Sequence, residues 1–126
     1  MAYSSVQNYK EQAIKTMTSG ELLILLLNEA TKNLRASTIM FDEGNMEAFE
    51  TCLLRSKDIF FYLSNILDMQ YEISDDLHEI YGFICNEIMK AGFKKDKKPI
   101  EEVLPLVEDL RITWIEANKI TTKENA

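Results

Sequence analysis

The stretch from Met17 to Leu27 constrains the fold most, because it joins a helix start to an unusually apolar run. Thr18 is a good N-cap, and Glu21 stands where a capping-box carboxylate reaches back to the cap. The six residues from Leu22 to Leu27 are all aliphatic. A packed helix needs only an apolar stripe, whereas these turns are apolar on every side. Six residues are too few to span a bilayer, which takes roughly 20, so we expect other protein to cover them.

The composition predicts one acidic, helical domain. A chain of 126 residues suits a single domain, and only four glycines and two prolines leave room for long helices. The net charge of −7 argues against binding to nucleic acid, whose phosphates it would repel. Cys52 and Cys85 stand among apolar residues and are expected to be buried thiols in a reducing compartment. With no secretion signal evident, we expect a cytosolic protein that does not insert directly into a membrane.

Four segments carry apolar residues that recur in steps of three and four, the pattern of bundle helices. They run from about residue 19 to 43, 46 to 69, 74 to 92 and 99 to 120. The predicted seams are Leu23, Leu27, Ala30, Leu34, Ser37 and Phe41; Met46, Phe49, Leu53, Ser56, Phe60, Leu63 and Leu67; Leu77, Tyr81, Ile84, Ile88 and Ala91; and Ile100, Val103, Val107, Leu110, Trp114 and Ala117.

Short connections between these segments predict the topology. Gly44 is expected to end the first helix and Asn45 to cap the second, while Ser74 should cap the third and Gly92 close it. So few connecting residues force neighbouring helices to run antiparallel. The fold class predicted is therefore all-α: an up-down-up-down four-helix bundle over residues 18–120. A mobile or docked N-terminal arm (1–17) precedes it, and a flexible C-terminal tail (121–126) follows.

Two residues leave helix geometry open. Gly82 lies inside the third segment, at a cost of about 1 kcal/mol relative to alanine. It indicates either the close approach of a neighbouring helix or a tolerated defect. Pro105 should kink the fourth helix or delay its start, because it lacks the backbone N–H.

The sequence offers no convergent chemistry, so we expect no enzyme, no cofactor and no metal. His78 is the only histidine, which excludes a two-histidine zinc helix and a di-iron bundle. Asp75 and His78 could share a metal, but a solvent-facing helix start is favoured. No phosphate-binding glycine loop or nucleophile elbow is present. A lysine cluster near residues 90–98 is expected to be a solvated loop, with docking of an acidic partner as the alternative.

More apolar residues are present than four seams use. A third stripe accounts for part of this surplus, and the remainder predicts an exposed patch larger than a monomer usually carries. A four-helix bundle can bind an amphipathic helix in a groove between its helices, so we predict a binding module. The candidate groove residues are Leu22, Ile24, Leu25, Ile59, Ile66, Phe83, Ile112 and Ile115.

Over nearly its whole length the chain resembles the flagellin export chaperone family, FliS. The resemblance rests on Tyr9 in the arm, on Thr18-Ser19-Gly20-Glu21-Leu22 and on the leucines that follow. Two later motifs, in the same order and spacing as in the family, are Ile80-Tyr81-Gly82-Phe83-Ile84 and Leu110-Arg111-Ile112-Thr113-Trp114. One departure is Leu27-Asn28-Glu29-Ala30, where the family often has Tyr-Asp-Gly.

The resemblance implies a cytoplasmic chaperone that binds the disordered C-terminal segment of flagellin. It would prevent premature polymerisation and deliver flagellin to the flagellar export apparatus. It also implies contact with the membrane export gate, through positions that match Val6 and Tyr9, and in some members with the flagellar anti-sigma factor.

Our hypothesis is that Tyr3, Val6, Tyr9 and Ile14 cover the first helix until a client displaces them. The alternative is a self-associating structural or adaptor bundle, a homodimer when free, that has no flagellin client.

Overall fold

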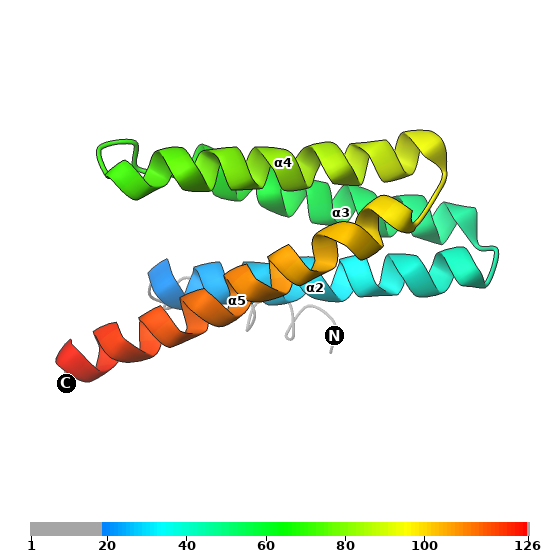
Figure 1. Ribbon diagram of the computed structural model, residues 1–126. Helices are drawn as coiled ribbons and strands as arrows, with labels where there is room; N and C mark the ends of the chain where they lie inside the picture. The colour runs from blue at the N-terminus through cyan, green and yellow to red at the C-terminus, as the bar shows by residue number, and fades with distance from the viewer. Residues whose placement is uncertain (1–18, 126) are drawn as a thin grey trace, which may run out of the picture.

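The structure, a computed structural model, describes residues 19–125, which form four helices and no strand. Successive helices run antiparallel (Figure 1). Helix α2 packs against α3 and α5, and α4 packs against the same two, so the helices close a ring in chain order. This arrangement confirms the all-α four-helix bundle predicted from the seams. The helices are α2 (Ser19–Asp42), α3 (Met46–Asn65), α4 (Glu72–Lys94) and α5 (Lys98–Asn125).

Several predictions concern parts of the chain outside these helices. The arm, with Tyr3, Val6, Tyr9 and Ile14, lies outside the described residues, as does the cap residue Thr18. At the other end, the helical backbone of α5 continues through residues 121–125, which we had assigned to the tail. The division into arm, bundle and tail stays a prediction.

The predicted seams form the core. A buried cluster takes residues from all four helices, and the seam residues Leu23, Phe41 and Trp114 pack against it half-buried. The helices exclude water by facing one another along these stripes, which is the main source of bundle stability. The buried hydrophobic residues are Leu27, Ala30, Leu34, Phe49, Leu53, Phe60, Leu63, Leu77, Tyr81, Ile84, Ile88, Ala91, Ile100, Val103, Val107 and Leu110.

The connection between α2 and α3 is the one predicted. Gly44 has φ of 77°, a left-handed conformation that glycine adopts at little cost. The N–H of Asn45 donates to the Met40 carbonyl at 2.9 Å, and the N–H of Gly44 donates to the Phe41 carbonyl at 3.0 Å, which is a Schellman end. The side chain of Asn45 then accepts from the N–H of Ala48 and caps α3.

The connection between α3 and α4 differs from the prediction. Helix α3 ends at Asn65, four residues before the expected Met69, and α4 begins at Glu72. Ser74 therefore lies inside α4 and is not its N-cap, since the N-cap is Tyr71. The hydroxyl of Ser74 is buried and donates to the carbonyl of Asp68 at 2.6 Å. Ser74 stabilises the connection that precedes α4 instead of the helix end.

The expected helix end at Gly92 was also wrong, and one of the two alternatives was excluded at Gly82 and at Pro105. Gly92 does not end α4, which continues to Lys94 and is followed by Lys95 in a left-handed conformation. No neighbour approaches Gly82, since a Cβ there would meet no atom within 4 Å. Pro105 does not delay the start of α5, because the helix begins at Lys98 and continues through the proline. Its exposed position is consistent with this tolerance.

Helix α5 crosses the bundle obliquely, and its last turns diverge from α4 (Figure 1). The indole N–H of Trp114 on α5 donates a hydrogen bond to the hydroxyl of the buried Tyr81 on α4. Burial raises the pKa of Tyr81, and this hydrogen bond acts in the opposite direction. This hydrogen bond therefore joins α4 to α5.

The adjacent phenylalanines of α3 provide a matched test of the core. Phe60 is fully buried beside Tyr81, whereas 63% of Phe61 is exposed. We expect Phe60→Ala to lower the free energy of unfolding by about 3–5 kcal/mol, because it leaves a cavity. Phe61→Ala should change it by less than about 1 kcal/mol. Urea denaturation of both variants measures this, and equal losses would contradict the inward orientation of Phe60.

The Tyr81–Trp114 bond is tested by a double-mutant cycle. Tyr81→Phe and Trp114→Phe each remove one partner while retaining an aromatic ring. We expect a coupling free energy of about 1 kcal/mol, the usual contribution of a hydrogen bond to stability. Denaturation of both single variants and of the double variant gives this value. A coupling energy near zero would show that α4 and α5 do not interact through this pair.

Candidate partner-binding surface

Exposed apolar side chains gather on one pair of helices. Among residues 19–119, whose burial the structure describes, twelve large hydrophobic side chains are exposed, and ten of them belong to α3, α4 or the connection between them. We call this unit, residues 46–94, the hairpin. Single exposed apolar residues are common on proteins, but a concentration of this kind marks an interaction surface. The ten are Leu54, Phe61, Tyr62, Ile66, Met69, Tyr71, Ile73, Phe83, Met89 and Phe93.

A shallow apolar groove runs between α3 and α4, which lie side by side in Figure 1. Leu54 and Met89 are each about half exposed, and they line a hollow of about 150 Å³ whose floor includes Gly92. Phe61 stands seven residues after Leu54, two helical turns along the same face of α3. Leu54 in the groove and Phe61 beyond it are thus apolar anchors at the spacing with which a bound helix presents its own side chains.

A second apolar hollow lies at the open end of the bundle. It has a volume of about 270 Å³. All four helices and the α3–α4 connection contribute to it, and we call it the end cavity. Its polar groups include the hydroxyls of Ser19 and Ser74. Its apolar lining includes Leu23, Leu63, Ile66, Leu67, Tyr71, Ile73, Leu77 and Trp114.

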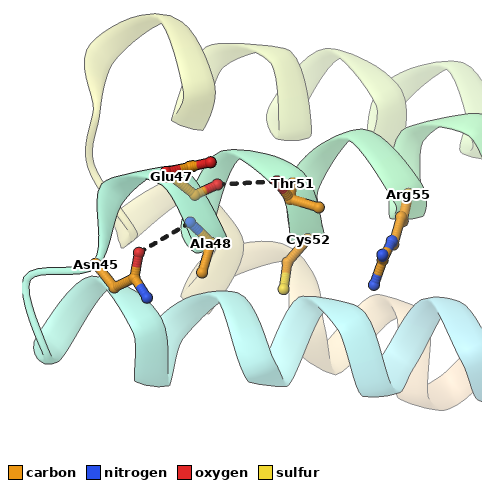
Figure 2. A pocket seen from close by; sticks show the side chains of 6 residues that line it. All are labelled: Asn45, Glu47, Ala48, Thr51, Cys52 and Arg55. Atoms are coloured by element: carbon orange, nitrogen blue, oxygen red, sulfur yellow. Dashed lines mark hydrogen bonds between the residues drawn. The ribbon is translucent and has the colours of Figure 1, made fainter.

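A third hollow, of about 330 Å³, has a structural explanation. Figure 2 shows it along the first half of α3, where it is lined by Asn45, Thr51, Cys52, Arg55 and two neighbours. Asn45 Oδ1 accepts from the N–H of Ala48 at 3.1 Å, and Thr51 Oγ1 donates to the Glu47 carbonyl at 3.0 Å. These polar groups satisfy the first turns of α3, so they do not converge on a ligand.

Residues 19–125 contain no arrangement of His, Cys, Asp and Glu that could hold a metal ion. His78 is exposed, and its Nδ1 lies 2.8 Å from Ser64 Oγ, so it joins α4 to α3. Cys85 is half-buried, and burial raises the pKa of its thiol, which opposes thiolate formation. In the same part of the chain, no helix is long and apolar enough to cross a membrane.

The structure separates the eight predicted groove residues. Ile66 and Phe83 are exposed on the hairpin, and Ile66 lines the end cavity. Ile112 is exposed on α5, away from the hairpin. The other five are half-buried and so offer a partner less surface: Leu22, Ile24, Leu25, Ile59 and Ile115.

Sequence reasoning missed Leu54, Phe61 and Phe93. One indication was present, because Phe60, Phe61 and Tyr62 are consecutive and a helix cannot bury three successive aromatic side chains in one core. The seam pattern placed Phe60 inside, which leaves the other two outside. Phe93 is 91% exposed, more than any other large hydrophobic residue whose burial is described, and it stands in the last turn of α4 without any distinctive spacing.

Comparison with known proteins supports a role in flagellar secretion. The family model described as flagellar protein FliS matches residues 2–121. A flagellar secretion chaperone FliS from Bacillus subtilis is 26% identical over 116 residues, which cover 92% of this chain and 87% of the relative. Its counterpart from Vibrio cholerae is 23% identical, and the match covers 87% of this chain and 85% of the relative. The flagellar secretion chaperone FliS from Salmonella typhimurium is 25% identical, and the match covers 90% of this chain and 84% of the relative.

The match covers the bundle and its hairpin as one unit, since the residues matched by the family model include α2, α3 and α4 entirely and most of α5. The relatives also match this chain over most of their own length. The chain therefore belongs to the FliS family of flagellar secretion chaperones.

Proposed function

We propose that this protein is a cytosolic chaperone for flagellin. It binds the disordered C-terminal segment of flagellin, prevents premature polymerisation and delivers the subunit to the flagellar export apparatus. The observation that carries the proposal is the concentration of exposed apolar side chains on the hairpin. Such a surface is costly to leave in water, and the family membership indicates that it serves a client.

The groove and the end cavity suit a client that folds as it binds. A disordered segment can form amphipathic helices whose apolar faces cover Leu54, Phe61 and Met89, and it loses conformational entropy in doing so. Two separate hollows, between α3 and α4 and at the open end, can engage successive parts of one extended segment. This favours a long unfolded client over a compact one.

The groove residues proposed from the sequence fit this route in part. Ile66 lines the end cavity, and Phe83 is exposed on the hairpin. A client that continues beyond the end cavity reaches the first turns of α2, where Leu22, Ile24 and Leu25 are half-buried. We propose these as the outer part of the client surface.

We extend the proposal to the arm and to further partners. Ser19, the first residue that the structure describes, lines the end cavity. In the free protein, Tyr3, Val6, Tyr9 and Ile14 would cover the cavity until a client displaces them. Displacement would free Val6 and Tyr9 to contact the membrane export gate, and the flagellar anti-sigma factor is a further proposed partner.

A synthetic peptide with the C-terminal sequence of flagellin tests the client surface. We expect a one-to-one complex and a gain in helical circular dichroism, because the peptide folds on binding. Phe61→Ala should raise the dissociation constant about tenfold or more, as loss of an aromatic anchor does. Isothermal titration calorimetry measures both the stoichiometry and the affinity.

The matched control is Ile39→Ala. Ile39 is 54% exposed, like Leu54, but lies on α2 outside the hairpin. This variant should bind the peptide as the parent protein does. Equal weakening by Ile39→Ala and Phe61→Ala would contradict a client site on the hairpin, and absence of binding would refute the flagellin client.

Deleting residues 1–16 tests the arm. We expect the shortened protein to stay folded, to bind a hydrophobic fluorescent dye more strongly and to retain its affinity for the flagellin peptide. The reason is that the arm would compete with the client for one apolar surface. Unfolding of the bundle, or loss of peptide binding, would show that the arm belongs to the fold or to the client site.

The self-associating bundle predicts a different result. A homodimer would bury the hairpin surface without a peptide, since each copy would cover the apolar side chains of the other. Analytical ultracentrifugation of the free protein and of the mixture distinguishes the two. A stable dimer that the flagellin peptide does not dissociate would favour the alternative.

A further inference from the structure

A basic hollow lies on the side of the bundle opposite the hairpin. Helices α2 and α5 pack against each other across the ring from the boundary of α3 and α4. Between them is a cavity of about 270 Å³, lined by Asn28, Thr31, Lys32, Arg35 and Arg111. Three of these five side chains are cationic, in a protein whose net charge is −7. We call this hollow the basic pocket.

The positive charge of the basic pocket is only partly neutralised. Arg35 forms an ion pair with Glu108, and Arg111 Nη2 lies 3.3 Å from the second oxygen of the same carboxylate. Arg111 Nη1 also donates to Asn28 Oδ1 at 3.2 Å, which fixes its guanidinium at the wall of the pocket. Among the residues that the structure describes, Lys32 makes no hydrogen bond or ion pair. One carboxylate among three cations leaves a surplus of two positive charges.

Apolar side chains flank the pocket along both helices. Ile39 and Ile112 are the only large exposed hydrophobic residues that the described chain carries outside the hairpin. Ile39 stands one turn after Arg35 on α2, and Ile112 one turn after Glu108 on α5. A surface with cations at its centre and isoleucines beside them is complementary to an amphipathic helix whose apolar face also carries acidic residues.

We propose that the basic pocket is a second polypeptide-binding site, which takes an acidic amphipathic segment of a partner protein. A carboxylate of that segment binds between Lys32 and Arg35, and its apolar side chains contact Ile39 and Ile112. The acidic surface elsewhere would repel nucleic acid or an anionic membrane over a wider area, which favours a single compact segment. The proposal does not depend on the flagellin client, because the basic pocket shares no lining residue with the groove or the end cavity.

A designed peptide provides the probe. The peptide is an amphipathic helix of about four turns, with two glutamates one turn apart between leucines. A second version of the peptide has glutamine in place of both glutamates. Fluorescence anisotropy of the labelled peptides gives the affinity for the full-length protein at low and at high sodium chloride. The glutamate peptide should bind, and salt should weaken its binding because the attraction is between charges. The glutamine peptide should bind about five- to tenfold more weakly.

Two lysine variants locate the site. Lys32→Glu should weaken binding of the glutamate peptide about tenfold, whereas Lys94→Glu, the same charge reversal on α4, should not. Circular dichroism checks that both variants fold, and Lys32→Gln provides a milder change. The proposal is overturned if the glutamate peptide does not bind, if the glutamine peptide binds equally well, or if Lys94→Glu has the effect of Lys32→Glu.

Competition tests the independence of the two surfaces. Saturating flagellin peptide should leave the affinity for the glutamate peptide unchanged. Displacement of one peptide by the other would show a single shared site and overturn the second-site proposal, while leaving the flagellin client intact. Conversely, failure of the flagellin peptide to bind would refute the proposed function without affecting the basic pocket.

Discussion

Close packing of α2 against α3 is the interaction on which the rest of the bundle depends. Ser56 and Ala30 are both fully buried, and Ser56 Oγ lies 3.5 Å from the Ala30 carbonyl oxygen of the facing helix. Side chains this small let the two backbones approach closely. The buried hydroxyl donates to the Cys52 carbonyl at 3.0 Å, so it does not lose a hydrogen bond on burial. Because α2 covers one side of α3, the remaining faces of α3 are left for α4 and for solvent.

That arrangement divides the molecular surface into two chemically different sides. Along α2 and α5 the boundary is closed by charged groups: Arg35 and Glu108 at its centre, and Lys97 with Asp42 at one end. The Lys97–Asp42 bond, 2.7 Å long, raises the pKa of Lys97 and ties the α4–α5 connection to the end of α2. The boundary of α3 and α4 carries exposed apolar side chains where the boundary of α2 and α5 carries ion pairs. Exposed ion pairs stabilise little, so this division has more consequence for binding than for folding.

The core and the bundle topology could be predicted from the sequence, because both follow from local periodicity and from the Gly44-Asn45 turn. The α3–α4 connection could not, because Ser74 is held by a contact with Asp68 that no helix-start pattern contains. The client surface was harder still. Periodicity identifies Phe60 as buried and leaves Phe61 outside the core, but it does not show that Phe61 joins other exposed apolar side chains in one surface. The end cavity depends on the oblique course of α5, which no residue spacing encodes.

The proposed client would fold as it binds to an apolar surface on the bundle, so two opposing free-energy terms would set its affinity. Each anchor that a client places over Phe61 or in the end cavity gains hydrophobic free energy. Each client residue that becomes ordered on binding loses conformational entropy. A large contact area therefore yields only moderate affinity. Because the anchors lie in two separate hollows, a client could also leave one before the other. Release in two steps then requires no single large barrier, which suits the proposed role as a carrier.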